Sequence, residues 1–103
     1  MSRKASPVTD AMLAQLAGSI VRRRHRVEAI RANNGITVVD RRTGASVARL
    51  TPVPGTDRYT VRWWSDVRGR WMPADALGDI RLTLEEAGPS IAEDSVFWLS
   101  VER

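Results

Sequence analysis

The chain has 103 residues, of which 43% are hydrophobic and 27% charged, and its formal net charge at pH 7 is +4. This length and composition suit one globular domain and exclude a largely disordered chain. The absence of cysteine excludes disulfides, thiolate metal sites and cysteine nucleophiles. No apolar run approaches the roughly 20 residues of a membrane-spanning helix, and the polar N-terminus lacks the apolar segment of a signal peptide. We therefore expect a soluble cytoplasmic protein with no membrane partner.

Positive charge is concentrated in the first three quarters of the chain. Residues 1–74 carry 14 Lys and Arg against 5 Asp and Glu, whereas residues 75–103 carry 2 against 7. A basic segment of this kind attracts polyanions by releasing their counterions. Fifteen of the sixteen basic residues are arginine, a bias that a GC-rich genome also produces without any phosphate-binding surface. Both interpretations stay open at this stage.

The N-terminal region predicts a short arm followed by a helix. Residues 1–8 are expected to be a flexible arm before a single domain at 9–103. Thr9 is a suitable N-cap, and five apolar residues then follow helical spacing: Leu13, Leu16, Ala17, Ile20 and Val21. A longer helix would place Arg24 and Arg31 on this apolar stripe, so we expect it to end near Arg24.

The middle of the chain predicts an antiparallel meander of four to five strands. Asn33-Asn34-Gly35 separates two β-rich segments, and Asn-Gly favours a type I′ hairpin turn because positive φ is needed at both central residues. Prolines at 52 and 54 interrupt the pattern because proline has no N–H to donate. Polar turns at 41–44 and 66–69 supply the other reversals. The expected strands are 27–32, 36–39, 46–52, 58–65 and 70–73.

The last third predicts a second helix and a final strand. Gly88-Pro89 is a helix stop signal, and four apolar residues before it share one face of a helix at 75–87: Leu77, Ile80, Leu84 and Ala87. Gly78 interrupts this helix, and Asp79 is an alternative N-cap. The apolar segment 95–101 predicts a C-terminal strand with Phe97 and Trp98 on opposite faces. The sum is an α+β domain in which the helices pack on one face of the sheet.

The segment 58–71 holds three of the four tryptophans, and strand alternation divides its side chains between two faces. We expect turn 66–69 to be a type I turn with a G1 bulge, which pairs Asp66 with Arg70 and brings Trp71 beside Trp63. The uncharged face, expected to meet the helices, then consists of Tyr59, Val61, Trp63 and Trp71. The opposite face is the main candidate for stacking bases and holding phosphates: Arg58, Arg62, Trp64 and Arg70. The alternatives are arginine stems that merely cover Trp64, or packing against another copy of the chain.

The densest charge cluster is Arg-Arg-Arg-His-Arg at 22–26. It is an auxiliary candidate for gripping phosphate, through Arg22, Arg23, Arg24 and Arg26. On a helix these side chains would spread around the whole circumference. A solvated helix end, where cations suit the macrodipole, is therefore the competing interpretation.

No motif predicts catalysis, a metal or a cofactor. His25 is the only histidine, and no serine or carboxylate stands in a recognisable motif with it. No ligand spacing predicts a metal site, and no glycine-rich loop predicts a nucleotide. An enzyme would need a concave pocket around His25 in which the imidazole works with a carboxylate. No small-molecule ligand can be identified from the sequence.

The pattern resembles a family of small bacterial proteins known only as a domain of unknown function. The matching segments span most of residues 12–99: Arg22-Arg23-Arg24, Val47-Ala48-Arg49, Tyr59 to Trp63, Trp71, and Phe97-Trp98. The chain departs from the family at Met72, where the family usually has histidine, and in continuing past the Phe-Trp pair to residue 103. Because the family has no established activity, the resemblance implies the layout of elements and no function.

These observations predict a small bacterial, non-catalytic binding module that associates with nucleic acid or another polyanion. The alternative is a protein-interaction or homodimerisation module that uses Trp64, Met72 and one side of the final strand, since Trp and Met are enriched at interfaces. The third hypothesis is an uncharacterised enzyme that uses His25.

Overall fold

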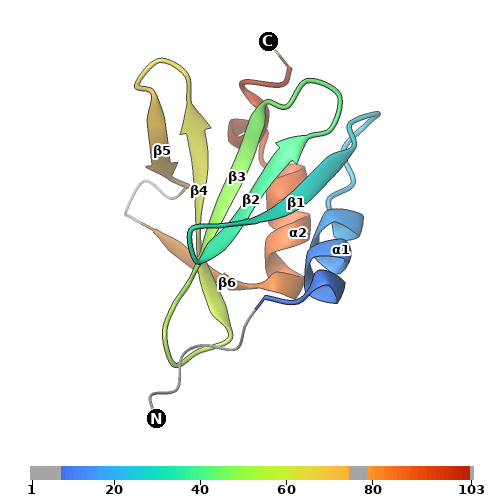
Figure 1. Ribbon diagram of the computed structural model, residues 1–103. Coiled ribbons are helices and arrows are strands. Elements are labelled where there is room, and N and C mark those ends of the chain that lie inside the picture. The colour runs from blue at the N-terminus through green and yellow to red at the C-terminus, as the bar shows by residue number, and fades with distance from the viewer. Residues whose placement is uncertain (1–7, 75–78, 103) are drawn as a thin grey trace.

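The computed structural model describes residues 8–74 and 79–102 as a six-stranded antiparallel sheet with two α-helices and a short 3₁₀ helix (Figure 1). The elements in chain order are α1 (Asp10–Ser19), β1 (Val27–Ala32), β2 (Gly35–Asp40), β3 (Ser46–Pro52), β4 (Arg58–Ser65), β5 (Arg70–Pro73), β6 (Ile80–Thr83), α2 (Leu84–Glu93) and η1 (Ser95–Trp98). None of the helices described is long and apolar enough to cross a bilayer.

The sheet is a meander in the order β1-β2-β3-β4-β5, and β6 pairs with the half of β4 that β5 leaves free. Both α-helices lie on one face of it (Figure 1), which confirms the predicted α+β architecture. The predicted strands 27–32, 46–52, 58–65 and 70–73 coincide with β1, β3, β4 and β5. The predicted arm lies outside the described residues except for Val8, which packs against the core.

The β1–β2 hairpin turns on two asparagines. Asn33 and Asn34 have φ of 46° and 64°, as a type I′ turn requires. Gly35 belongs to β2 instead of the turn centre, and a Cβ on it would lie 2.5 Å from the carbonyl oxygen of Leu50. Glycine is needed there because strands β2 and β3 approach closely.

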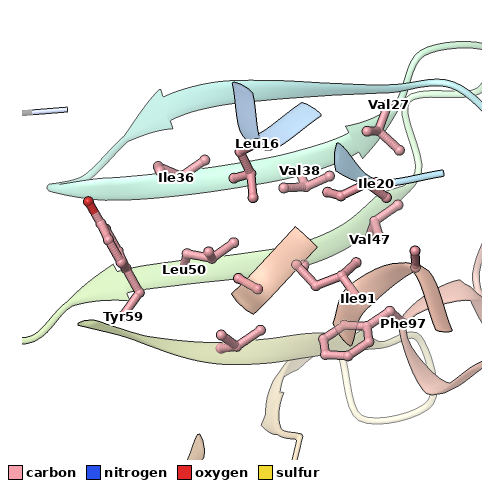
Figure 2. Close-up of a cluster of buried hydrophobic side chains, with 14 of the residues drawn as sticks. Leu16, Ile20, Val27, Ile36, Val38, Val47, Leu50, Tyr59, Ile91 and Phe97 are labelled. Carbon is pink, nitrogen blue, oxygen red and sulfur yellow. The ribbon is translucent and has the colours of Figure 1, made fainter. Parts of the chain in front are cut away.

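The core fills the space between the sheet and the two helices (Figure 2). Helix α1 contributes Leu16, its C-cap is the buried Ile20, and α2 contributes Ile91. The side chain of Trp98 is fully buried and its Nε1 donates to the Ile91 carbonyl oxygen at 2.8 Å. The largest fully buried side chains of the sheet are Ile36, Val38, Val47, Leu50 and Val61.

Helix α1 is shorter than predicted. It ends at Ser19 with Ile20 as its C-cap, whereas the apolar stripe placed its end near Arg24. Residues Arg22 and His25 form an isolated bridge, and Arg23 adopts a φ of 50°. At this turn the Arg22 side chain forms an ion pair with Glu102 in the C-terminal segment, a contact that local periodicity does not reveal.

The predicted second helix is displaced. Residues 75–78 of that prediction lie outside the described residues, and Ile80–Thr83 forms strand β6. Helix α2 begins after Thr83, whose side chain and that of Glu86 form a reciprocal capping box. The helix continues through Pro89, so Gly88-Pro89 is not a stop. A Cβ on Gly88 would collide with Ser19 Oγ, which shows that this glycine serves the packing of α2 on α1.

The predicted C-terminal strand is also wrong. Residues Ser95–Trp98 form a 3₁₀ helix, in which Phe97 and Trp98 are both buried, 3% and 0% exposed. The Asp94 side chain accepts from the Val96 N–H and so caps this turn. A helical turn places both rings in the core, whereas a strand would have separated them.

The β4–β5 register differs from the predicted one by one residue. Ser65 pairs with Arg70, Trp64 with Trp71 and Trp63 with Met72. The loop closes on Ser65, whose carbonyl oxygen accepts from the Gly69 N–H at 2.7 Å. Directly paired residues share a face, so Trp71 lies on the face of Trp64, away from the helices. Arg70 shares the other face with Ser65, so the prediction that it lies beside Trp64 is wrong.

Candidate anion-binding site

A hollow of about 740 Å³ opens between the α1–β1 turn and the β2–β3 turn. Figure 1 shows these two turns at the same end of the sheet as the C-terminus. The volume lies within the range of about 300–1,000 Å³ that is usual for ligand pockets. The lining residues are Arg23, Arg24, His25, Arg26, Asp40, Arg41 and Arg42.

The pairing of β1 with β2 brings the two turns together. Val27 pairs with Asp40, and just beyond this last pair the Arg41 N–H donates to the Arg26 carbonyl oxygen at 2.8 Å. Arginines that are fifteen positions apart in the sequence therefore lie on adjoining backbone. This places the 41–42 pair beside the 23–26 cluster.

Asp40 holds the β2–β3 turn in shape. Its Oδ2 accepts from the Thr43 N–H at 3.0 Å and from the Thr43 hydroxyl at 2.8 Å. Its carbonyl oxygen accepts from the Gly44 N–H at 2.7 Å, and Gly44 has the positive φ that the turn needs. Asp40 is only 2% exposed. The turn therefore withdraws its carboxylate from solvent and leaves the adjacent Arg41 and Arg42 exposed.

Arg22 anchors the other turn to the C-terminal segment. Its Nε and Nη2 donate to the two carboxylate oxygens of Glu102 at 2.9 and 3.0 Å, and its Nη1 donates to the Ala92 carbonyl oxygen at 2.9 Å. The guanidinium also lies over the Trp98 ring, 5.4 Å from its centroid. Hydrogen bonding and charge from Arg22 lower the pKa of Glu102 to about 2. Arg22 therefore has a structural role and does not line the hollow.

His25 lies between two carboxylates. Its Nε2 is 3.0 Å from Glu102 Oε2, and its Nδ1 is 4.0 Å from Asp40 Oδ1. The ring stacks on Trp98 with a centroid separation of 5.3 Å. The concave pocket that an enzyme would need around His25 is present. Its Nε2 is already engaged by Glu102, however, and its other nitrogen faces Asp40, an arrangement that orients the ring more than it offers a general base.

The arginines of the hollow are largely free of carboxylate partners. Within residues 8–74 and 79–102, no carboxylate lies within 4 Å of Arg24, Arg26, Arg41 or Arg42, and Arg23 reaches Glu102 only at 3.8 Å. Five arginines against one aspartate give the described lining residues a net charge of +4 when the histidine is neutral. Such a concentration of unneutralised charge attracts anions strongly.

The sheet face opposite the helices carries the principal residues predicted for binding. Arg62 and Arg58 are exposed there, but each has a carboxylate partner. Arg62 donates to both oxygens of Asp79, at 2.9 and 2.8 Å, and these bonds lower the pKa of Asp79. Arg58 lies 3.5 Å from Glu86. The face is open, as its prediction as a binding surface requires, yet the two predicted arginines Arg58 and Arg62 are already paired. Arg49 and Arg81 lie on the same face and have no carboxylate within 4 Å among the described residues.

The aromatic part of this open face is a pair of half-buried tryptophans. Trp64 and Trp71 meet edge to face, with centroids 5.3 Å apart and an interplanar angle of 70°. Trp64 Nε1 donates to Asp66 Oδ1 at 2.9 Å, which fixes the orientation of the indole. Arg70 lies across the sheet from this pair, so the structure does not assemble the four residues predicted for this face into one surface.

Sequence reasoning missed Arg41 and Arg42 as site residues. Their turn was recognised, but their closeness to Arg23, Arg24 and Arg26 depends on the strand register of β1 and β2. The available signal was two arginine-rich turns flanking a hairpin, which an antiparallel pair must bring to the same end of the sheet.

In the residues that the structure describes, no group of three or more His, Asp or Glu side chains is arranged to hold a metal ion. Comparisons of the chain with protein-family models, with curated proteins and with solved structures found no match. The resemblance inferred from its aromatic motifs therefore stays a prediction.

Proposed function

We propose that the protein is a non-catalytic module that binds nucleic acid through the arginine hollow. The observation that carries this proposal is the cluster of Arg23, Arg24, Arg26, Arg41 and Arg42 around one concavity of about 740 Å³. Arginine suits this role because its planar guanidinium donates two parallel hydrogen bonds to phosphate oxygens. The open sheet face is a weaker candidate because Glu86 and Asp79 neutralise Arg58 and Arg62, the two arginines predicted to bind there.

Binding of this kind depends strongly on salt. Each phosphate that a protein neutralises on a single strand contributes about −0.7 to the slope of log K against log[salt]. If all five arginines of the hollow engage phosphates, the slope is roughly −3 to −4. The magnitude of this slope reports how many of the five arginines are used.

The test is fluorescence anisotropy with labelled single- and double-stranded DNA and RNA at 50–200 mM salt. We compare the wild type with the double variant Arg24→Gln/Arg42→Gln, whose targets have no carboxylate partner in the described residues. The matched control is Arg58→Gln/Arg81→Gln. Arg81 of β6 pairs with Thr60 and so shares the open sheet face with Arg58, and the control removes the same charge there. We expect the hollow variant to lose at least about tenfold in affinity and about 1–2 in slope magnitude. The control keeps most of the wild-type affinity.

Two results contradict the proposal. The first is no binding to any nucleic acid at 50 mM salt by folded wild-type protein. The second is an equal loss of affinity in the two double variants, because binding would then depend on the net charge of the protein and not on the hollow.

A second candidate function is self-association or protein binding through the Trp64–Trp71 pair. This pair is half-buried on the face that the helices leave uncovered, and tryptophan is enriched at the centres of interfaces. Light scattering at 10–200 µM tests the self-association. A dimer that Trp71→Ala dissociates supports this second function, whereas a monomer over the whole range rejects homodimerisation.

A further inference from the structure

We infer that the hollow receives a terminal phosphate monoester of a nucleic-acid strand, in preference to the phosphodiesters of its interior. This inference rests on the proposed function and specifies which part of the nucleic acid the site recognises. Three features of the hollow carry it: its concave shape, its surplus of free guanidinium groups and its lack of an exposed aromatic platform.

The shape favours a chain end. The α1–β1 and β2–β3 turns are joined by the hydrogen bond from the Arg41 N–H to the Arg26 carbonyl oxygen, and the arginines therefore surround a hollow instead of lying along a flat stripe. A continuous duplex backbone is convex and follows flat or grooved surfaces. A strand end can place its last phosphate inside a hollow of this volume, which is adequate for a small ligand.

The charge favours a monoester. A phosphate monoester carries about −1.5 to −2 at pH 7 and three strong acceptor oxygens, whereas a backbone diester has one negative charge and two such oxygens. Arg24, Arg26, Arg41 and Arg42 have no carboxylate partner within 4 Å in the described part of the chain. Each guanidinium has five N–H donors. A group with more charge and more acceptors gains most from such a cluster.

Among the described residues, Asp40 is the only carboxylate of the lining, and it does not compete for the arginines at close range. Its Oδ2 is engaged by the backbone and hydroxyl of Thr43, and its side chain is almost completely buried. Its negative charge still opposes an anion, but the five surrounding arginines outweigh it.

The hollow recognises charge and not base identity. His25 is the only aromatic residue that lines it in the part of the chain that the structure describes, and one side of that ring is stacked on the buried Trp98. Sequence-specific recognition of single strands relies on stacked bases and contacts to their edges. We therefore expect little dependence on the terminal base.

The experiment uses the full chain and fluorescent single strands of one sequence with four kinds of end: 5′-phosphate, 3′-phosphate, hydroxyl at both ends, and circularised. The label is internal, and affinities are measured at 150 mM salt. We expect the strand phosphorylated at one of its two ends to bind about five- to tenfold more tightly than the hydroxyl-ended and circular strands. Arg24→Gln/Arg42→Gln removes this preference, and Arg58→Gln/Arg81→Gln retains it.

The outcomes separate this inference from the proposed function. Equal affinities for all four strands overturn the inference and leave nucleic-acid binding in place, while no binding to any of them overturns both. Competition by a nucleoside 5′-monophosphate at a concentration near the Kd of the phosphorylated strand would show that the free nucleotide is the ligand, which overturns the assignment to a strand end. The comparison of the four strands uses the wild-type protein alone, so its result does not depend on whether a variant folds.

Discussion

Replacing Glu102 with Gln tests whether the ion pair near the C-terminus holds the α1–β1 turn in place. The substitution preserves the shape of the side chain but removes the charge that Arg22 engages through two hydrogen bonds and that also faces His25. Lowering the pKa of a carboxyl group from 4.5 to about 2 corresponds to roughly 3 kcal/mol of stabilisation at neutral pH. Solvent screening of side chains that are 12% and 19% exposed reduces the expected loss to about 1–2 kcal/mol.

The assay is urea denaturation followed by tryptophan fluorescence between pH 7 and pH 3. Because the pKa of Glu102 is lower in the folded state, its contribution is complete above the unfolded value near 4.5 and is lost as the pH falls toward 2. We therefore expect Glu102→Gln to lower the free energy of unfolding by about 1–2 kcal/mol at pH 7 and by less than half of that at pH 3. The matched control is Glu28→Gln, which removes an exposed charge from β1. A deficit that does not change with pH, or one no larger than that of the control, would refute the electrostatic account.

Two other substitutions test the corrected second helix. Thr83→Ala removes the N-cap of α2 and should lower the free energy of unfolding by about 1 kcal/mol, whereas a helix starting near residue 75 predicts almost no effect. Gly88→Ala introduces a Cβ that would lie 2.8 Å from Ser19 Cβ, and we expect a loss of about 1–3 kcal/mol. The double variant Gly88→Ala/Ser19→Gly should recover part of that loss, and both are measured by thermal unfolding. Stabilisation by Gly88→Ala alone, as helix propensity predicts, would contradict the close packing of α2 on α1.

The elements that the sequence predicted correctly are those whose signals are local. The turn at Asn33-Asn34 and the alternation of apolar residues along 46–52 and 58–65 define strands that pair with their neighbours in the chain. Each of these signals lies within about ten residues. Strand order in a meander follows from them because short turns make consecutive strands antiparallel neighbours.

The elements that were predicted wrongly depend on contacts across the chain. Strand β6 forms because Ile80 and Leu82 lie opposite Val61 and Tyr59 of β4. The sequence of residues 80–83 alone is equally compatible with a helix. The capping box of Thr83 and Glu86 was a local signal for the true start of α2 and was overlooked. Trp98 packs against His25 and Arg22, more than seventy residues away, and no local pattern distinguishes this burial from a strand.

The ion pairs show how the basic and acidic parts of the sequence interact in the folded domain. Three carboxylates from the acidic last quarter of the chain pair with three arginines from the basic part: Glu102 with Arg22, Glu86 with Arg58, and Asp79 with Arg62. These pairs hold the C-terminal segment, α2 and β6 against the rest of the domain. The last two pairs also neutralise Arg58 and Arg62 on the open sheet face, although Arg49 and Arg81 keep their charge there. The turns at 23–26 and 41–42 keep most of theirs. The total number of arginines therefore identifies no binding surface, and the hollow is distinguished by the gathering of five arginines around one concavity.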